Sequence, residues 1–174
     1  MLRGPVPSDA NDRLAAGFDR EVIRLQGGEP SDYTEPMTRA WADQWYERLA
    51  ADENPWAWMI EHEGSQVGTA RLYNPVHVDR KATYAVALNS SAQLGQGLGT
   101  EVTRLVLDFA FTPEPDGAGL HRVELRVLDF NLRGIGCYRR CGFIEEGRER
   151  DAAFVDGAWR DYVVMAILES DHPA

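Results

Sequence analysis

The spacing of apolar residues in the N-terminal half predicts two helices followed by three strands. Helical periodicity covers Ala10 to Leu25 and Met37 to Ala50, and the segment Gly27-Gly28-Glu29-Pro30 is expected to end the first helix. Short runs of β-branched, aromatic and other apolar residues, separated by turn-forming residues, are typical of strands. These predicted strands are Trp56 to His62, Val67 to Tyr73 and Tyr84 to Leu88, with a turn at Glu63-Gly64-Ser65-Gln66.

In the C-terminal half, segments with the apolar spacing of a helix alternate with segments that have the apolar spacing of a strand. Apolar residues recur at helical spacing from Leu98 to Phe109, whereas Val123, Leu125 and Val127 alternate as they do in a strand. A second helix is predicted to begin after Asn131 as N-cap and to run through Cys141, with Gly142 as the left-handed residue that ends it. The pair Asp156-Gly157 then predicts a hairpin turn, and the apolar segment Tyr162 to Leu168 a buried strand.

This order of elements favours an α/β chain with a mixed sheet. Hairpins predominate early and a strand–helix–strand crossover lies in the middle, so we expect helices on both faces of the sheet. The length of 174 residues, with no repeat or break in composition, predicts a single domain over residues 1–174.

Composition and charge narrow the classes of function. Hydrophobic residues make up 44% of the chain and charged residues 26%, which is typical of a globular protein. The net charge of −10 disfavours nucleic-acid binding, which needs a positive surface, and mildly favours a cationic partner. No apolar run is long enough to span a membrane and the N-terminus lacks an apolar signal core, so we expect a cytoplasmic protein.

The two cysteines, Cys137 and Cys141, lie four residues apart on a predicted helix. This spacing is too long for a relaxed disulfide, and two residues are too few for a zinc site. We therefore interpret them as small buried residues and predict no metal.

Three glycines at alternate positions precede the helix that begins near Leu98, within the segment Ala92 to Phe111. The P-loop of nucleotide hydrolases needs a lysine where this chain has Thr100, and the dinucleotide fingerprint needs its third glycine two residues after Gly99. A helix start can also bind a pyrophosphate through backbone N–H groups and the helix dipole alone. Pyrophosphate binding is favoured over glycines that only form a turn.

The segments LGQGLGTEVTRLVLDFAF and LHRVELRVLDFNLRGIGCYRRCGFIEEGRERDAAFVDGAWRDYVVMAI together resemble the GNAT family of N-acetyltransferases. The second segment is similar to the subgroup of ribosomal-protein alanine N-acetyltransferases. The resemblance covers residues 83–167, which would form the half that binds acetyl-CoA. It implies an α+β fold with a mostly antiparallel sheet of six to seven strands, acetyl-CoA as co-substrate, an amine acceptor and a homodimer.

The resemblance also implies roles for individual residues. Tyr138, in N-x-x-G-x-x-x-Y-x-x-x-G-F, would donate a proton to the departing sulfur, and Asn131 would contact the pantetheine arm in addition to capping its helix. Arg133 either reaches a phosphate or lies in solvent. The remaining expected contacts with acetyl-CoA are Val86, Ala87 and Leu88, one of whose N–H groups would polarise the acetyl carbonyl, and the loop Gln93, Leu94, Gly95, Gln96, Gly97, Leu98, Gly99 and Thr100. Leu94 departs from the family, whose loop usually begins with Arg or Gln.

The sequence leaves the general base and the acceptor open. Many relatives carry Glu where this chain has Thr83; the candidate substitutes are Tyr84, His77, Asp79 and the pair Glu145-Glu146, or a chain of water molecules. Direct attack by the amine would leave the cysteines without a nucleophilic role. Four tryptophans, Trp41, Trp45, Trp56 and Trp58, either pack in the core or line an acceptor pocket.

The acceptor would be a protein N-terminus or a small cationic amine. Two other classes of function remain as alternatives. One is a CoA-binding module that has lost catalysis, which the absent acid at Thr83 favours; the other is a nucleotide-binding protein.

Overall fold

The computed structural model describes residues 1–28, 33–51 and 56–172. In chain order its elements are β1 (Leu2–Arg3), α1 (Asp9–Ala16), α2 (Arg20–Leu25), α3 (Arg39–Ala50), β2 (Trp56–His62), β3 (Ser65–Val76), β4 (Lys81–Leu88), η2 (Ser91–Gln93), α4 (Leu98–Phe111), β5 (Arg122–Leu128), α5 (Leu132–Arg140), β6 (Ile144–Val155), β7 (Ala158–Leu168) and η3 (Glu169–Asp171).

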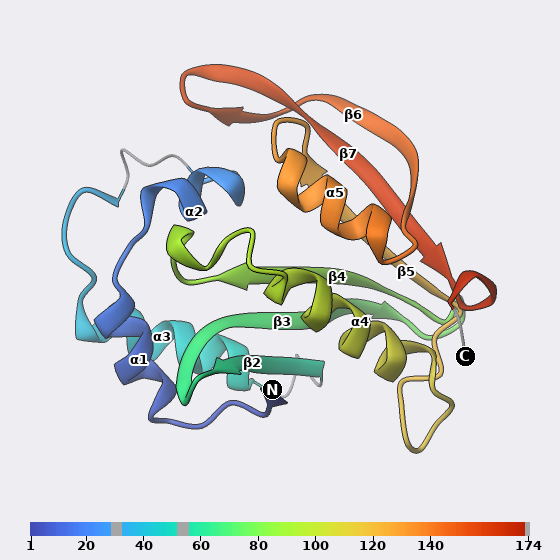
Figure 1. The fold of residues 1–174 in the computed structure, drawn as a ribbon, viewed down its shortest axis with the longest axis horizontal. Helices are drawn as coiled ribbons and strands as arrows, with labels where there is room; N and C mark the ends of the chain where they lie inside the picture. The colour runs from blue at the N-terminus through green and yellow to red at the C-terminus, as the bar shows by residue number, and fades with distance from the viewer. Residues whose placement is uncertain (29–32, 52–55, 173–174) are drawn as a thin grey trace.

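The seven strands form one sheet in the order β1-β2-β3-β4-β5-β7-β6. All neighbours pair antiparallel except β4 and β5, which are parallel, and the right-handed crossover expected of such a pair contains α4. The mixed, mostly antiparallel sheet predicted from the sequence is therefore confirmed (Figure 1).

Helices cover both faces of the sheet. Ile60, Ala70 and Leu72 pack in the same buried cluster as Val102 and Val106 of α4, which places α4 against one face. Figure 1 shows α4 and α5 in front of the sheet and α3 behind it. Because successive strand residues point to opposite faces, the residues that alternate with Ala70 and Leu72 face the side of α3.

The first predicted helix was wrong as a single element, because it divides into α1 and α2. Gly17 adopts φ 65°, which interrupts the helical backbone, and Asp19 then starts a new helix. The Asp19 carboxylate accepts the N–H groups of Glu21 and Val22 at 3.0 and 3.1 Å. Of the residues expected to end the predicted helix, Glu29 and Pro30 lie outside the described residues.

The other boundaries differ from the predictions by a few residues. Thr38 caps α3 by accepting the N–H of Trp41, so the helix begins two residues after Met37. At the predicted hairpin, Asp156 and Gly157 have φ 54° and 70°, as a tight type I′ turn requires. The two-residue strand β1 was not predicted, because two residues carry no periodicity.

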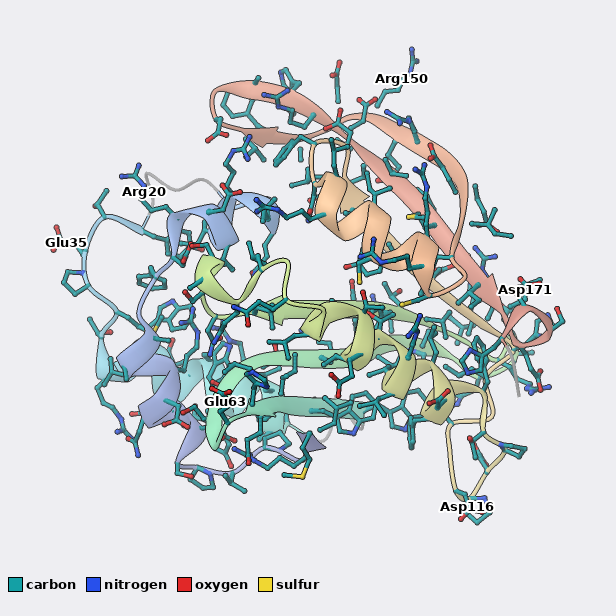
Figure 2. The ribbon with its side chains drawn as sticks, viewed as in Figure 1. Arg20, Glu35, Glu63, Asp116, Arg150 and Asp171 are labelled. Carbon is teal, nitrogen blue, oxygen red and sulfur yellow. The ribbon has the colours of Figure 1, made fainter. Side chains whose placement is uncertain are left out.

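The acidic excess lies at the surface. Glu35, Glu63, Asp116 and Asp171 are all exposed, and Figure 2 shows Glu35, Asp116 and Asp171 at the periphery of the molecule. These carboxylates add negative charge to the surface.

Candidate functional site

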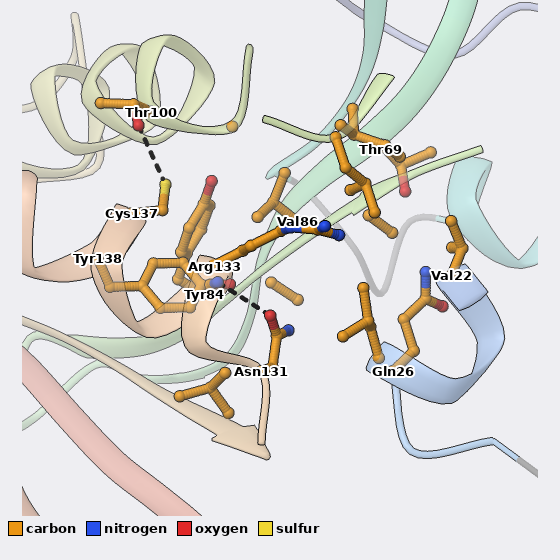
Figure 3. A pocket seen from close by; sticks show the side chains of 18 of the residues that line it. Val22, Gln26, Thr69, Tyr84, Val86, Thr100, Asn131, Arg133, Cys137 and Tyr138 are labelled. Carbon is orange, nitrogen blue, oxygen red and sulfur yellow. Dashed lines mark hydrogen bonds between the residues drawn. The ribbon is translucent and has the colours of Figure 1, made fainter. Parts of the chain in front are cut away.

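A cavity opens where β4 and β5 separate. Their pairing covers only Lys81 to Thr83 opposite Arg122 to Glu124, although both strands continue beyond these residues. The gap widens into a cavity of about 1250 Å³ that is lined from β3, β4 and β5 and from α2, α3, α4 and α5 (Figure 3).

Most of the residues predicted to bind acetyl-CoA are brought together on this cavity. Those that line it are Val86, Ala87, Leu88, Gln93, Leu94, Gly95, Gly97, Gly99, Thr100, Asn131, Arg133 and Tyr138. The Gln96 and Leu98 side chains point elsewhere: Gln96 donates to the carbonyl of Ala92 at 2.7 Å, and Leu98 is buried under the start of α4.

Two of the three loop glycines need backbone conformations that other residues rarely adopt. Gly95 has φ 78° and Gly97, the N-cap of α4, has φ 89°. These turns precede the 14-residue helix α4, whose first turn lies on the cavity. The N–H groups of Thr100 and Glu101 donate to the carbonyl of Gly97 at 2.9 and 3.1 Å, whereas those of Leu98 and Gly99 have no acceptor within the helix. A Cβ on Gly99, by contrast, would lie at an ordinary 3.7 Å from the Sγ of Cys137. A helix start of this kind, open to a cavity, can bind an anion through its backbone amides.

The start of α5 forms the opposite wall of this site. Asn131 caps the helix by accepting the N–H of Gly134 at 2.9 Å, as predicted. Arg133 extends into the cavity in Figure 3, and its guanidinium lies 3.9 Å from the Glu21 carboxylate of α2. Helix α2 and the start of α5 thus face each other across the cavity. Asp19, the N-cap of α2, also accepts the N–H of Ser91 at 2.7 Å. This hydrogen bond joins the start of α2 to η2, the turn that precedes the glycine loop.

Tyr138 lies beside Tyr84, with both rings on the cavity. Burial raises the pKa of Tyr138 above its ordinary value, and the nearby sulfurs of Cys137 and Cys141 raise it further. The hydroxyl is therefore protonated at neutral pH and can act as a proton donor.

Cys137 lines the cavity, which the sequence analysis did not predict. Cys137 and Cys141 are both free thiols. A hydrogen bond from Cys141 lowers the pKa of Cys137 to about 6, although partial burial opposes this shift. The hydroxyl of Thr100 also donates to Cys137 at 3.4 Å. The same partnership raises the pKa of Cys141.

Four of the candidate bases lie away from the cavity. His77 and Asp79 are exposed in the turn that precedes β4, whereas the cavity adjoins the other end of that strand. Glu145 forms ion pairs with Arg139 and Arg148, and Glu146 pairs with Arg122. These surface pairs point to a structural role for both glutamates.

The other candidate, Tyr84, reaches the cavity but does not have the properties of a base. Its side chain is 3% exposed and its hydroxyl lies 3.0 Å from that of Thr103. Burial raises the pKa of Tyr84 well above its ordinary value. Thr83, where relatives carry Glu, lies in the paired part of β4 opposite Glu124.

The four tryptophans divide between packing and the cavity. Trp56 and Trp58 pack against Phe109 of α4, with ring centroids 6.3 and 5.2 Å apart. Trp41 meets another aromatic ring edge-on at 5.1 Å. Trp45 lines the cavity. The alternative of an acceptor pocket thus stays open for Trp45, whereas the other three serve as packing residues.

Arginines dominate the charged part of the cavity lining. They are Arg48, Arg71, Arg104, Arg126, Arg133 and Arg140, and within the described residues Glu101 is the only carboxylate among the lining residues. Of these arginines only Arg133 was predicted from the sequence, because an arginine in a strand or helix usually indicates a solvated position. The alternation of Thr69, Arg71 and Tyr73 on β3 was the available signal.

The part of the chain that the structure describes contains no group of three or more His, Cys, Asp or Glu side chains that could hold a metal ion. None of its helices combines the length and the hydropathy needed to cross a membrane.

A family model described as "Acetyltransferase (GNAT) domain" matches residues 1–144. The chain belongs to the GNAT acetyltransferase family. It is accordingly an acetyl-CoA-dependent N-acetyltransferase, and the resemblance identified in the sequence is confirmed.

Curated relatives cover most of this acetyltransferase. The probable N-acetyltransferase YjcK of Bacillus subtilis is 30% identical over 140 residues, which are 80% of this chain and 75% of that protein. The spermidine N(1)-acetyltransferase of Escherichia coli is 28% identical over 129 residues, 74% of this chain and 67% of that protein. The subgroup noted in the sequence is also represented, since the ribosomal protein uS5-alanine N-acetyltransferase of Escherichia coli is 27% identical over 105 residues, 60% of this chain and 52% of that protein.

Solved structures share the fold of this acetyltransferase. The spermidine N-acetyltransferase of Vibrio cholerae in complex with CoA and spermine superimposes with a TM-score of 0.80 at 21% identity, over 98% of this chain and 96% of that chain. At that identity the likeness concerns the fold alone.

Proposed function

We propose that this acetyltransferase moves the acetyl group of acetyl-CoA directly to the primary amine of a small molecule. Relatives that act on spermidine favour a small acceptor, and the relative that acts on a ribosomal protein provides the competing case of a protein N-terminus. The observation that carries the proposal is the cavity between β4 and β5, because it joins the backbone amides of α4 on one face of the sheet to the α3 side on the other.

The residues around the cavity fit acetyl-CoA. Gly95 and Gly97 have positive φ angles, and a Cβ at either position would meet no atom within 4 Å. The space beside the first turn of α4 is therefore open, and there the N–H groups and the helix dipole favour a pyrophosphate. Arg133 projects into the same space and supplies a mobile positive charge. We infer that Arg133 and the loop bind the phosphates, with Asn131 facing the pantetheine arm.

The unpaired edge of β4 supports a role in polarising the acetyl carbonyl. Beyond Thr83 the strand pairs with β3 alone, so alternate N–H groups along Tyr84 to Leu88 face the gap. An N–H group aimed at the acetyl oxygen stabilises the negative charge that develops there as the amine attacks.

The proposed reaction needs no acyl-enzyme. The acceptor nitrogen forms a bond to the acetyl carbon, the carbon–sulfur bond breaks, and the sulfur takes its proton from Tyr138. The proton that the amine loses passes to water, since the described cavity lining holds a single carboxylate, Glu101, which lies in the first turn of α4 at the coenzyme side. Tyr138 regains a proton from solvent after the thiol leaves.

The test is a thiol-release assay over amino acids, polyamines, aminoglycosides and peptides with varied N-termini. We expect release with small primary amines and little with peptides; preference for peptides would favour the protein N-terminus. If none of these amines causes thiol release although CoA binds tightly, the result would favour a binding module instead. Binding is measured separately: acetyl-CoA at 100 times its Kd should stabilise the protein by about 2.7 kcal/mol, which raises the Tm by roughly 5–10 °C. ATP and NAD should not.

A further inference from the structure

The cavity has two sides, and Arg71 belongs to the side away from the predicted coenzyme loop. On β3, Ala70 and Leu72 pack with Val102 of α4, so Arg71 between them points to the opposite face of the sheet. That face is the side of α3, from which Trp45 lines the same cavity. Arg71 is therefore placed where an acceptor would enter, and not beside the amides at the start of α4.

No described carboxylate neutralises Arg71. Its guanidinium carbon lies 4.6 Å from the ring centroid of Tyr73, a cation–π contact that orients the group, and the ion pairs among residues 1–28, 33–51 and 56–172 do not include it. Arg126, across the gap on β5, provides the contrast because it pairs with Glu149. Glu101, the sole described carboxylate on the cavity, is in the first turn of α4 on the other face. Among the described residues, Arg71 thus places a positive charge without a carboxylate partner on the α3 side of the cavity, in a protein whose net charge is −10.

We propose that the acceptor is a small primary amine that carries an acidic group, such as an amino acid or an aminoalkylphosphonate, and that Arg71 binds this group. The proposal rests on the function proposed above and specifies its substrate class. A guanidinium binds a carboxylate or a phosphonate through paired N–H groups. An acceptor with several ammonium groups, such as spermidine, would meet the positive charge of Arg71, and no described carboxylate on that side of the cavity compensates for it.

The position of Arg71 along β3 fits an acceptor of small size. Arg71 is paired with Ala85 of β4, so the backbones of these two residues are neighbours, about 5 Å apart. Arg71 and the β4 edge where the acetyl carbonyl is expected therefore line one short stretch of the cavity, which suits an acceptor whose amine and acid are separated by few bonds. The rings of Trp45 and Tyr73 line the same side and offer apolar contact to the rest of the acceptor.

The first measurement compares acceptors that differ only in charge. Amino acids, the matching amino-acid amides, aminoalkylphosphonates and spermidine are assayed by thiol release with saturating acetyl-CoA. We expect kcat/KM for acids to exceed that for the amides by roughly 10- to 100-fold, mainly through KM, because the amides lack the charge-assisted bond. The class with the higher kcat/KM, amino acids or aminoalkylphosphonates, identifies the acidic group that the enzyme prefers. Equal use of acids and amides, or preference for spermidine, would overturn the inference while leaving acetyl transfer intact; failure of every amine would remove the proposed function as well.

The second measurement assigns the preference to Arg71. Arg71→Gln should reduce the ratio of kcat/KM for acids to kcat/KM for amides to near one, mainly through a higher KM for the acids, and Arg71→Lys should restore part of the ratio. Arg150→Gln is the matched control, because Arg150 is exposed on β6 at the outer edge of the molecule (Figure 2) and carries the same change in charge. A ratio that persists in a folded Arg71→Gln protein would show that another group binds the acid.

Discussion

The rings of Tyr84 and Tyr138 meet edge to face, with centroids 6.3 Å apart and an interplanar angle of 85°. Their hydroxyls have different surroundings. The Thr103 hydroxyl donates its single hydrogen to the carbonyl of Gly99 at 2.6 Å, so the bond of 3.0 Å between Thr103 and Tyr84 must be donated by Tyr84. The proton of Tyr84 is thus used inside the core, whereas that of Tyr138 remains available to the cavity.

Tyr84→Phe should change activity little. Both the hydrogen bond and the raised pKa keep the Tyr84 hydroxyl protonated over the working pH range, so it cannot take a proton from the amine. We expect kcat within about threefold of the wild type and a loss of stability of about 0.5–1.5 kcal/mol from the missing hydrogen bond. Thiol release against pH and a denaturant melt measure the two effects. A tenfold fall in kcat together with a changed pH profile would identify Tyr84 as the base after all.

Tyr138→Phe should abolish turnover selectively. Without a proton donor the leaving sulfur departs as an unprotonated thiolate, and general-acid catalysis is worth about 10²- to 10⁴-fold. We expect kcat to fall by that factor while the affinity for acetyl-CoA, measured by calorimetry, stays within about twofold. Tyr46→Phe is the matched control, because Tyr46 packs in the separate cluster of α1 and α3. Unchanged kcat in Tyr138→Phe would assign the proton donor elsewhere.

The parts of the fold with strong periodicity were predictable from the sequence. Strand β2 begins and ends at the predicted residues, and α4 follows the apolar repeat from Leu98. The break at Gly17 to Asp19 was not predicted, because the apolar repeat continues through it and only the left-handed Gly17 and the cap at Asp19 interrupt the backbone.

For the site, the glycine loop and the segment with Tyr138 were recognisable because their spacing is local. Arg71 was missed because its role depends on tertiary structure. In the sequence it is a polar residue that alternates with buried ones, which usually indicates solvent. Only the separation of β4 from β5 turns that face of β3 into the wall of a cavity.

Cys137 should react with alkylating reagents at a pH well below that at which an ordinary cysteine thiol becomes reactive. Its pKa of about 6 means that the thiolate predominates above that pH, so the rate of iodoacetamide labelling should be half-maximal near pH 6 and level off by pH 7. Cys141→Ala removes the hydrogen bond that lowers the pKa and should move the midpoint upward. Because Cys137 lines the cavity, CoA should slow its labelling. Mass spectrometry locates the label; a rate that still rises between pH 7 and 9 would contradict the low pKa.

Asp19 should contribute stability that is lost in acid. Burial alone would raise the pKa of its carboxyl, but hydrogen bonds from Ser91, Val22 and Glu21 outweigh it and lower the pKa. A carboxyl with a lowered folded-state pKa stabilises the fold above its unfolded pKa, and the contribution disappears as the pH falls through the folded value. Asp19→Ala should cost about 0.5–2 kcal/mol at pH 7 as a lost N-cap. The difference from the wild type, measured by denaturant melts, should shrink towards pH 2. A difference independent of pH would exclude the carboxylate as its source.

Substitution of two loop glycines should have different effects: at Gly97 it should lower stability, and at Gly99 it should weaken the binding of acetyl-CoA. Gly97→Ala places a side chain at φ 89° and should cost about 1–2 kcal/mol of stability. Gly99 lies inside the first turn of α4, where alanine is a better helix former and its Cβ meets only the sulfur of Cys137 at 3.7 Å. Gly99→Ala should therefore leave the Tm equal or slightly higher, yet weaken acetyl-CoA binding, because the added methyl group occupies the space in front of the helix amides. Thermal melts and calorimetry with CoA measure the two quantities on the same samples. If Gly99→Ala binds CoA as tightly as the wild type, the phosphates do not approach that turn of the backbone, and the loop glycines act only in forming the turn.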